Sequence, residues 1–411
     1  MIVERSGILS IAVHGTGLLV KLGFLLALLH FCSPEVVGYY GLLAAIDLIV
    51  IYLAGLEFHT FTSRRYARHP SPARLRFCVA CHRRLLQFTA PLAAALAVCA
   101  AMALQIKFSV AGFIALAVIV ASGTIVQEMM RVMVLIGRPV ESLTLGLLRT
   151  TGWQPIAIPL LVKQVDVIER IALLWALAAI LAAVWGAYAL RQALRWSAPP
   201  AATYIRTGLF KAWRFYLIGS ASALQGNIER FVLQLYLGPA SVGVFVFFQT
   251  IANTVPALLQ SAVLNVGLPR VLVEFGQRRP GRLMLLRELC TRCFWIGLLI
   301  SAVVMLVTWP LLTVVSSGSY RAFFWVLPVL IVAQLVTMTT QPIHLAFYGA
   351  HRDGLLMWLS LFALTGAIAL TTLMAGTLGF PGVVVAPLAI AALVAAVRVY
   401  LLLRFRAKAR L

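Results

Sequence analysis

Residues 33–55 read SPEVVGYYGLLAAIDLIVIYLAG, and after Glu35 the only charged residue in this stretch is Asp47. A helix that crosses the hydrocarbon core of a bilayer needs about 20 predominantly apolar residues. The run from Val36 to Gly55 meets that requirement. We therefore expect it to form a membrane-spanning helix, and comparable runs recur before and after it along the chain.

The composition of the whole chain indicates the same class of protein. Of its 411 residues, 62% are hydrophobic and only 11% are charged, and the mean hydropathy is +0.98. An ordinary soluble domain is about half apolar and about one quarter charged. These values exclude a soluble globular protein, and with short connections the chain accommodates about a dozen spans.

The apolar runs predict an all-α membrane protein with about 12 transmembrane helices. The first run lacks the short hydrophobic core and the small-residue cleavage site of a signal peptide, so we interpret it as the first of these helices. The predicted spans are 8–31, 36–60, 85–105, 109–134, 143–162, 168–190, 213–237, 241–266, 294–315, 322–348, 354–377 and 382–403.

The formal charge of +22 is distributed unevenly along the chain. If the N-terminus is cytoplasmic, 25 Lys and Arg residues fall in cytoplasmic segments, and only Lys107, Lys163, Arg170 and Arg321 fall on the opposite side. Membrane proteins keep such residues in their cytoplasmic loops. The pattern therefore predicts a multi-pass protein of the bacterial inner membrane with both termini in the cytoplasm, and it argues against nucleic acid as a partner.

Two parts of the chain resemble each other in sequence. Residues 33–40, SPEVVGYY, match residues 238–245, GPASVGVF, at a shift of 205 residues, and residues 72–75, PARL, match residues 280–283, PGRL. The shared order predicts a duplication of six helices. Parallel repeats of this kind place the substrate site of a transporter between the two halves. The predicted lobes are residues 1–206 and 207–411.

Ionisable side chains inside the predicted spans are informative, because each costs about 2.5–3.5 kcal/mol to insert at the centre of a membrane helix. Lys21 in the first span and Asp47 in the second fall near the middle of the membrane. Lys21 is either a functional cation or one half of a structural ion pair with Asp47. Glu128 and Arg131 lie three residues apart on one helix face, where they can neutralise each other.

Polar residues also follow the predicted seventh and eighth spans. In the seventh, Asn227 and Arg230 share one helical stripe and Glu229 lies beside them. In the eighth, Gln249 and Asn253 lie one turn apart. Two such stripes indicate either a hydrated cavity or hydrogen bonds that hold packed helices together.

The sequence offers little for catalysis or for cofactor binding. It contains no Walker A motif, dinucleotide fingerprint, zinc-protease motif or nucleophile elbow. Cys78 with Cys81, and Cys290 with Cys293, form two C-x-x-C pairs, for which a four-thiolate zinc site is the alternative to apolar packing. We favour packing, and we expect a protein that is not an enzyme and that has no catalytic residue, metal or cofactor.

Three stretches resemble the polysaccharide flippases of the multidrug/oligosaccharidyl-lipid/polysaccharide exporter superfamily. They are residues 33–40; residues 55–58, GLEF, which lead to Arg64 and Arg65; and residues 227–245, in which NIERF is followed by an LGP turn and VGVF. In the last stretch Glu229 stands where the family has Asp, and Phe245 where it has Tyr.

The resemblance implies outward movement of an undecaprenyl-pyrophosphate-linked oligosaccharide by alternating access, coupled to an ion gradient. The pyrophosphate needs cations, and Lys21 and Arg230 lie deep in their spans. Basic loops at the cytoplasmic mouth would attract the lipid headgroup, although such loops also serve orientation alone. The implied site residues are Lys21, Arg230, Asn227, Gln249 and Asn253 for the substrate, Asp47 and Glu229 for ion coupling or charge balance, and Arg64, Arg65 and Arg270 for the cytoplasmic mouth.

The same resemblance implies partners and leaves alternatives open. The implied partners are the lipid-linked oligosaccharide, membrane lipids, and the polysaccharide polymerase and chain-length regulator of such pathways. A multidrug/cation antiporter of the superfamily would need an acidic, aromatic cavity, and a peptidoglycan-precursor flippase usually has two further helices. A membrane-embedded glycosyltransferase or polymerase would need a sizeable extramembrane loop with catalytic acids, and the predicted periplasmic loops are short.

Overall fold

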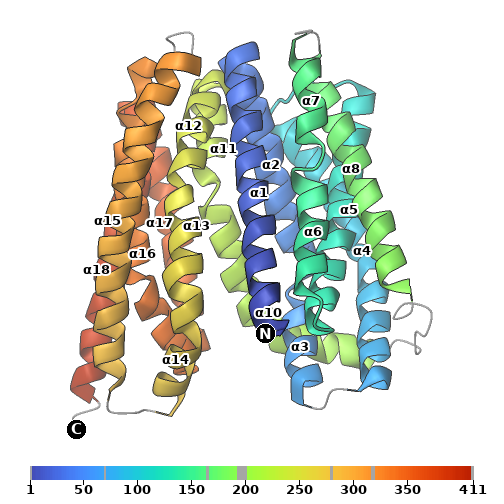
Figure 1. The fold of residues 1–411 in the computed structure, drawn as a ribbon, viewed down its shortest axis with the longest axis vertical. Helices are drawn as coiled ribbons and strands as arrows, with labels where there is room; N and C mark the ends of the chain where they lie inside the picture. The colour runs from blue at the N-terminus through green and yellow to red at the C-terminus, as the bar shows by residue number, and fades with distance from the viewer. Residues whose placement is uncertain are drawn as a thin grey trace. The chain divides into compact units, whose positions relative to one another are not determined.

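The computed structural model describes residues 2–68, 71–162, 166–191, 201–277, 281–315 and 320–408. All regular elements in these residues are helices, which confirms the predicted all-α membrane fold. By their internal contacts the residues form two compact units, Met1–Ala223 (unit 1) and Leu224–Leu411 (unit 2). This boundary lies inside α10 (Ala202–Gln225), the helix that also contains the predicted division after residue 206 (Figure 1).

Unit 1 is built around α5, which packs against α2, α4, α6 and α8. Alanines at helical spacing lie on the buried face of α8, among them Ala172, Ala176 and Ala179. Small residues of this kind let helices approach closely within a membrane. Besides α10, the helices of unit 1 are α1 Ile2–Phe31, α2 Pro34–Gly55, α3 Phe58–Arg68, α4 Pro72–Ala103, α5 Val110–Leu135, α6 Pro139–Thr150, α7 Gln154–Leu161 and α8 Val167–Ala189.

Unit 2 is built around α16, which packs against α12, α14, α15, α17 and α18. A π-helical turn, η1, and a 3-10 turn, η2, interrupt its α-helices. The bounds of the elements in unit 2 are α11 Ile228–Leu237, α12 Pro239–Ala252, α13 Thr254–Leu259, η1 Gln260–Leu264, α14 Asn265–Gly276, α15 Arg282–Val315, η2 Arg321–Phe323, α16 Val326–Gly349, α17 Asp353–Leu378 and α18 Phe380–Lys408.

The two units share one pattern of helix pairing. In each unit the fourth span, α5 or α16, packs against the third, α4 or α15, and against the sixth, α8 or α18. The opening span of each unit, α1 or α11, packs against the fifth, which is α6 with α7 in unit 1 and α17 in unit 2. This agreement supports the duplication inferred from the sequence.

Nine helices in the described residues are long and apolar enough to cross a membrane. The other three predicted spans are shorter or interrupted. The first offers a shorter apolar segment, Gly15–Phe31. The span predicted at 143–162 is divided into α6 and α7 by a break at 151–153, and the span predicted at 213–237 is divided into α10 and α11 by a break at 226–227.

Several predicted boundaries were wrong. The seventh span begins at Ala202 rather than at residue 213, and the eighth continues to Gly276 rather than ending at residue 266. The second span, predicted to reach residue 60, ends at Gly55, because the chain turns at Leu56 and Glu57, which have φ angles of 46° and 50°. The third and ninth spans begin at Pro72 and Arg282, well before the predicted residues 85 and 294. Hydropathy marks where a helix is apolar, and these two helices continue into polar, basic sequence.

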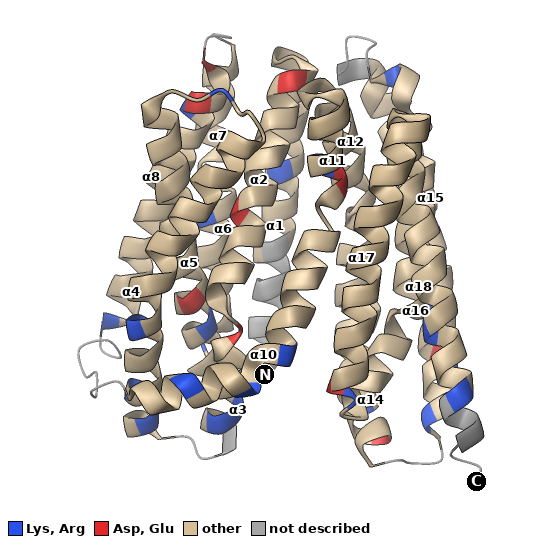
Figure 2. Ribbon diagram, turned by 180° about the vertical axis from the view of Figure 1, so that it is seen from behind, with Lys and Arg blue, Asp and Glu red and all other residues tan. Residues whose placement is uncertain are grey.

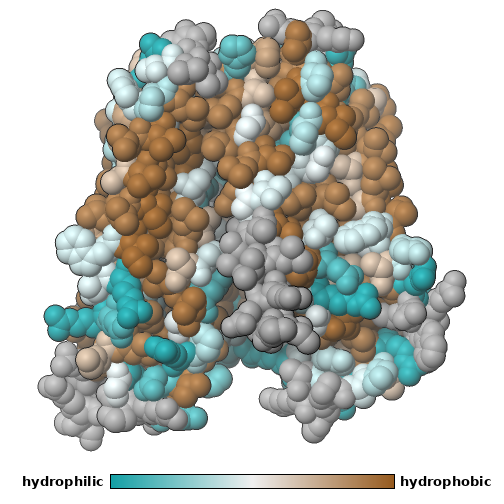
Figure 3. Space-filling model, in the orientation of Figure 1, coloured by the Kyte–Doolittle hydropathy of each residue, from teal (hydrophilic) through white to brown (hydrophobic). Residues whose placement is uncertain are grey.

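Apolar side chains cover the middle of the helices on the face in Figure 3, and hydrophilic side chains lie toward the helix ends. Leu181, Leu299 and Leu306 are between 59% and 76% exposed in the absence of lipid. Contiguous exposure of such side chains is typical of a surface that contacts another apolar phase. The surface therefore agrees with a multi-pass membrane protein.

Basic residues gather at one end of each unit. Figure 2 shows most of the blue ribbon of unit 1 at the end that carries α3, and blue ribbon of unit 2 near α14 and the end of α18. This placement accompanies the charge asymmetry seen in the sequence. The assignment of these ends to the cytoplasm stays a prediction.

Candidate functional site

An ion pair is buried in unit 1, between the second and fifth spans. Nη2 of Arg149, the next-to-last residue of α6, lies 2.6 and 2.5 Å from the two carboxylate oxygens of Asp47 on α2. The two residues are 7% and 5% exposed. Each charge alone would be costly to bury, and the close contact compensates both. Asp47 is therefore neutralised within its own unit.

The surrounding helices make room for this pair and support the break beside it. A Cβ atom on Gly123 of α5 would lie 2.6 Å from Arg149 Nη2 and 2.8 Å from Nε, so a larger residue there would require the Arg149 side chain to shift. At the break, Gln154 Nε2 donates a hydrogen bond to the Tyr40 hydroxyl at 3.2 Å, and Trp153 stacks on another tryptophan of unit 1. Interrupted helices at membrane depth are tolerated where other side chains satisfy the freed backbone.

The sequence-based ion pair between Lys21 and Asp47 is wrong, because Asp47 pairs with Arg149. The prediction overlooked a basic residue of the fifth span that packs against the second. Lys21 lies on α1 and is exposed. Its role in substrate binding stays a prediction, as does a role of Asp47 in ion coupling or charge balance.

A second polar site surrounds the break between α10 and α11 in unit 2. Asn227 precedes the first residue of α11, and both Asn227 and Glu229 are buried. One carboxylate oxygen of Glu229 has no hydrogen-bond partner. The side chain of Arg230 is half-buried beside it. The break thus brings an amide, an acid and a base together at the start of one helix.

Gln249 on α12 connects this break to the next span. Its Oε1 accepts a hydrogen bond from Arg230 Nε at 2.9 Å, and its Nε2 lies 3.5 Å from the carbonyl oxygen of Gly226. Asn253 lies one turn farther along, is exposed, and accepts a hydrogen bond from Gln334 Nε2 at 3.0 Å. The structure therefore brings Arg230 and Gln249 into contact, and it pairs Asn253 with α16.

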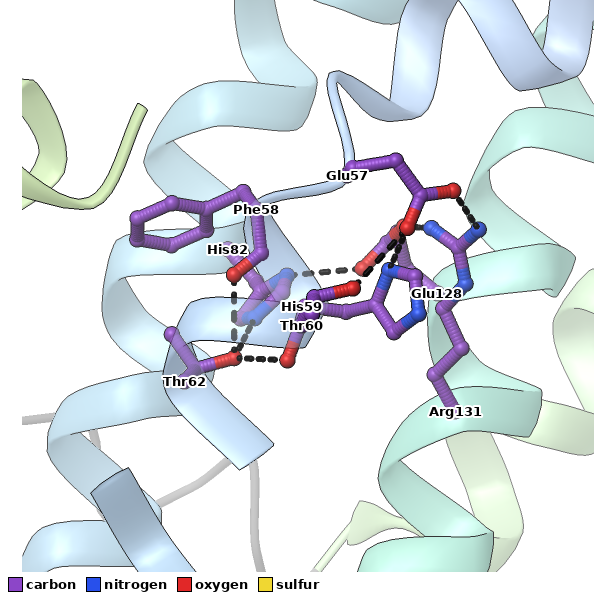
Figure 4. A network of polar contacts seen from close by, with 8 residues as sticks. All are labelled: Glu57, Phe58, His59, Thr60, Thr62, His82, Glu128 and Arg131. Atoms are coloured by element: carbon purple, nitrogen blue, oxygen red, sulfur yellow. Dashed lines mark hydrogen bonds and ion pairs between the residues drawn. The ribbon is translucent and has the colours of Figure 1, made fainter. Parts of the chain in front are cut away.

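A third polar cluster lies at the end of unit 1 that carries α3, where Figure 4 shows it. At the elbow between α2 and α3, Glu57 accepts a hydrogen bond from Thr60 Oγ1 at 2.9 Å, and its Oε1 lies 3.7 Å from Arg131 Nη2. Arg131 Nη1 also pairs with Glu128 Oε1, one turn earlier on α5. The predicted contact of Glu128 with Arg131 is present, but as part of a larger network.

Two side chains from α3 and α4 extend this network. His82 Nδ1 lies 2.7 Å from Glu128 Oε2, and His82 Nε2 lies 2.9 Å from Thr62 Oγ1. The same hydroxyl lies 3.0 Å from the carbonyl oxygen of His59, which can accept its hydrogen. His82, Glu128 and Thr62 are all buried. Glu128 and His82 are thus in close ion-pair contact, and His82 is hydrogen-bonded to Thr62.

His59 on α3 is the second histidine of the cluster, and it is uncharged at neutral pH. Its Nδ1 lies 3.6 Å from Glu57 Oε2, which is too far for a hydrogen bond. Burial, and then the neighbouring Arg131 guanidinium, lower the pKa of His59 to about 4. Both effects disfavour the charged imidazolium.

The predicted mouth residues are exposed, and the two in unit 1 rest on aromatic rings. The guanidinium of Arg64 lies 4.6 Å from the ring centre of Phe215, and that of Arg65 lies 5.0 Å from the ring centre of Tyr204. Arg270 belongs to α14 of unit 2 and borders an open surface pocket. Their attraction of a lipid headgroup stays a prediction.

Three side chains that lie in these clusters or inside a span were not predicted from the sequence: Arg149, Arg398 and His82. Arg149 and Arg398 are two of the seven Lys and Arg residues inside the predicted spans. Both could have been found as Lys21 was, by their position within an apolar run. His82 follows a basic segment and precedes Arg83, so nothing in the sequence distinguishes it. Its importance comes from tertiary contacts alone.

The described residues offer no cluster of three or more His, Cys, Asp or Glu that could hold a metal ion. Cys78 and Cys81 lie on α4 in unit 1, whereas Cys290 and Cys293 lie on α15 in unit 2, and all four are free thiols. Nothing in this arrangement supports the zinc alternative.

Comparison with known proteins identifies the fold. No family profile and no curated protein sequence matches the chain. A structure described as the inward-facing conformation of a multidrug resistance MATE family transporter of the MOP superfamily superposes with a TM-score of 0.77 over 98% of both chains, at 16% identity. The outward-facing conformation of a transporter described in the same way gives a TM-score of 0.66 over 98% of this chain and 93% of that one, at 16% identity. A Vibrio cholerae MATE transporter gives 0.57 over 93% and 96%, at 13% identity. The chain has the fold of the MATE transporters.

Proposed function

We propose that the protein is a flippase that moves an undecaprenyl-pyrophosphate-linked oligosaccharide from the cytoplasmic to the periplasmic face of the bacterial inner membrane. The moving parts are the lobes 1–206 and 207–411, which alternate in access and are driven by an ion gradient. The fold supports transport, since the similar structures are described as transporters in inward-facing and outward-facing conformations.

The ion pair between Asp47 and Arg149 is the main reason for proposing an anionic substrate. An exporter of cations needs a carboxylate that its substrate can reach. In unit 1 two buried carboxylates of the spans, Asp47 and Glu128, are paired with basic groups. Lys21 and Arg230 add further positive charge within the predicted spans. This balance favours an anion such as a pyrophosphate, which pairs strongly with basic side chains.

In this proposal Lys21 and Arg230 bind the pyrophosphate, because a doubly charged group drawn out of water needs more than one cation. Glu229 balances the charge of Arg230 when the substrate is absent. The residues that contact the remaining polar groups of the substrate are Asn227, Gln249 and Asn253. Arg64, Arg65 and Arg270 attract the headgroup to the cytoplasmic mouth.

Reconstitution tests the proposal directly. Purified protein is placed in lipid vesicles with a fluorescent undecaprenyl-pyrophosphate oligosaccharide, and a sugar-modifying enzyme added outside reports which molecules have crossed. We expect the modified fraction to exceed the half accessible in protein-free vesicles. If it stays at that half while the vesicles move a cationic dye, the protein is the antiporter alternative and the flippase assignment fails.

Two alternatives keep specific support. The similar structures are described as multidrug resistance transporters, which favours the cation antiporter as the second candidate. A peptidoglycan-precursor flippase would use the same fold and a related anionic lipid. Competition in the same vesicles between the oligosaccharide lipid and lipid-linked peptidoglycan precursor separates the two flippases, because the true substrate displaces the other at lower concentration.

The proposed orientation follows from the charge asymmetry. Cysteine substitutions at Arg74 and at Lys408 should react with a membrane-impermeant reagent only after the cells are opened. Labelling of either position in intact spheroplasts would reverse the orientation and overturn the twelve-helix topology. We also propose that the polysaccharide polymerase and the chain-length regulator of the pathway are partners of the protein.

A further inference from the structure

The contact between His82 and Glu128 requires a proton. His82 Nδ1 lies 2.7 Å from Glu128 Oε2 in a buried environment. A ring nitrogen without hydrogen would present a lone pair to a carboxylate oxygen, and two acceptors repel each other at this distance. Nδ1 therefore carries hydrogen, and the second ring nitrogen, Nε2, decides whether His82 is neutral or charged.

Thr62 can satisfy either state of Nε2 without moving a heavy atom. When His82 is neutral, the Thr62 hydroxyl donates to Nε2 across 2.9 Å. When a proton binds at Nε2, the new N–H donates to Thr62 Oγ1, and the hydroxyl hydrogen rotates to the carbonyl oxygen of His59 at 3.0 Å. A hydroxyl is both donor and acceptor, which a methyl group in its place would not be.

The charges around His82 leave room for one proton. Glu57 and Glu128 contribute two negative charges and Arg131 one positive charge, while His59 is neutral because of its low pKa. One proton on His82 makes the cluster neutral, and burial favours a neutral cluster over a charged one.

Cys78 and Tyr204, two further titratable groups on this side of the unit, add no charge to the cluster. Cys78 lies one turn before His82 on α4, and its Sγ is 3.8 Å from the Tyr204 hydroxyl on α10. Burial raises the pKa of Tyr204, so that its phenol stays protonated. Arg65 lies over the far ring face of Tyr204 and is exposed to solvent, which screens its charge.

We propose that His82, Thr62 and Glu128 form a proton-binding site that couples a proton gradient to movement of the α2–α3 elbow. The inference rests on the proposed function, which requires an ion gradient, and it names the ion. It also locates the coupling site away from Asp47, which is neutralised by Arg149.

A route for the proton exists on the surface of unit 1. A small, open cleft lies against the cluster between α3, α4 and α5. Its lining contains both proton-accepting partners, His82 and Thr62, together with His59, Ser63 and Arg131. The cleft lies at the end of unit 1 that the positive-inside pattern assigns to the cytoplasm, so the proposal has protons enter from that side.

Arg131 links the proton site to the elbow. It divides its two terminal nitrogens between Glu128 and Glu57, and Glu57 sits at the elbow with a positive φ that non-glycine residues rarely adopt. Strained backbone of this kind persists only where its surroundings hold it. A proton on His82 strengthens its ion pair with Glu128. Arg131 then shifts toward Glu57, and the stronger Arg131–Glu57 pair stabilises the elbow. Loss of the proton returns Arg131 to Glu128.

Histidine NMR tests the site without any transport substrate. The protein has seven histidines, and the difference between ¹⁵N-histidine spectra of wild type and His82→Gln assigns the signals of His82. We expect the spectra to show hydrogen on Nδ1 of His82 and the binding of a second proton at Nε2 in one step. Thr62→Val should lower the midpoint by about one pH unit, because the charged form loses its acceptor.

Two variants control this measurement. Thr62→Ser keeps the hydroxyl and should keep the wild-type midpoint. Thr89→Val removes a buried hydroxyl without a partner from α4 itself, two turns away, and should also leave the midpoint unchanged. A His82 signal that does not titrate between pH 5 and pH 9, or a midpoint that Thr62→Val and Thr89→Val move equally, overturns the proton site.

The vesicle assay tests the coupling separately. An imposed pH gradient should accelerate flipping by the wild type, and His82→Gln should flip at one rate with and without the gradient. If the wild type responds and His82→Gln responds equally, or if the flipping wild type shows no response, the coupling role is overturned. If the wild type does not flip the lipid at all, the proposed function fails, and the NMR result still decides whether the proton site exists.

Discussion

Arg149 and Asp47 lie 102 residues apart in the sequence, and one guanidinium nitrogen of Arg149 contacts both carboxylate oxygens of Asp47. The contact joins α6, which ends at the break of the fifth span, to the middle of the second span. It removes a negative charge from the interior of unit 1 without removing the carboxylate. The electrostatic character proposed for the transport path depends on this relationship.

Removing the arginine should destabilise the protein. Arg149→Gln leaves Asp47 buried without a counter-charge, and loss of one partner of a buried pair costs about 3–5 kcal/mol. Thermal unfolding of the purified protein in detergent should show a clearly lower midpoint. Arg138→Gln is the matched control, because Arg138 and Glu141 form an exposed pair at 3.4 Å, and exposed pairs contribute about 0–1 kcal/mol. An equal decrease of the unfolding midpoint in the two variants would mean that the buried pair stabilises the protein no more than the exposed pair does.

The space beside the pair gives a second prediction. Gly123→Ala introduces a Cβ atom 2.6 Å from Arg149 Nη2, which must shift away from Asp47. We expect a destabilisation of about 1–3 kcal/mol, as for other overpacked interiors. Gly366→Ala on α17 meets no atom within 4 Å and serves as the control. It should leave the unfolding midpoint unchanged or raise it slightly, since alanine favours helix. Normal stability of Gly123→Ala would contradict the close packing around Arg149.

The substrate cations give the third prediction. Lys21→Gln and Arg230→Gln should each abolish flipping in vesicles while the protein remains folded and membrane-inserted, because each removes one of the two charges proposed to hold the pyrophosphate. Lys21→Arg should retain part of the activity, since a guanidinium also pairs with phosphate oxygens. Full activity of Lys21→Gln at normal protein level would remove Lys21 from the substrate site and leave Arg230 as the remaining candidate.

Much of the fold could be predicted from the sequence because the membrane imposes its own pattern. Apolar runs and basic segments predicted the helices around Asp47 and the approximate ends of most spans. The breaks at 151–153 and 226–227 were not predicted, because a helix interrupted by two or three residues remains continuous in hydropathy. The Arg149 pair and the His82 cluster depend on which helices pack together, and one sequence does not reveal such contacts.

Acid should destabilise the protein partly through His59. Its pKa is about 4 in the folded protein, whereas an unfolded chain binds the proton near pH 6.5. The unfolded state therefore gains protons first as the pH falls, so the stability is fully present above pH 6.5 and declines toward pH 4. The contribution is at most about 3 kcal/mol.

His59→Gln measures this contribution as the difference between two pH profiles of the unfolding midpoint. The variant should lose less stability than the wild type between pH 6.5 and pH 4. His351→Gln replaces an exposed histidine of unit 2 and should follow the wild-type profile. Parallel profiles for wild type and His59→Gln would show that His59 gains its proton equally in the folded and unfolded states.

Gln249 gives the last prediction, because it is the side chain that holds Arg230 at the break of the seventh span. Its Oε1 accepts from Arg230 Nε at 2.9 Å, and its amide faces the carbonyl oxygen of Gly226. Gln249→Leu keeps the apolar contacts but removes this hydrogen bond to Arg230, so the cation is less precisely positioned for the substrate. We expect flipping to fall at least tenfold, as a loss of about 1.4 kcal/mol in positioning would produce.

Two further variants separate positioning from stability. Gln249→Glu keeps an acceptor for Arg230 and should recover part of the activity, whereas a purely structural amide would not be replaced by a buried carboxylate. Gln260→Leu removes an exposed amide that bonds to Asn265 in the same span, and should leave flipping unchanged. If Gln249→Leu flips the lipid at the wild-type rate, the position of Arg230 does not depend on Gln249. If Gln249→Leu and Gln249→Glu lose activity only in proportion to their unfolding midpoints, Gln249 supports the broken helix and has no separate role in placing the cation.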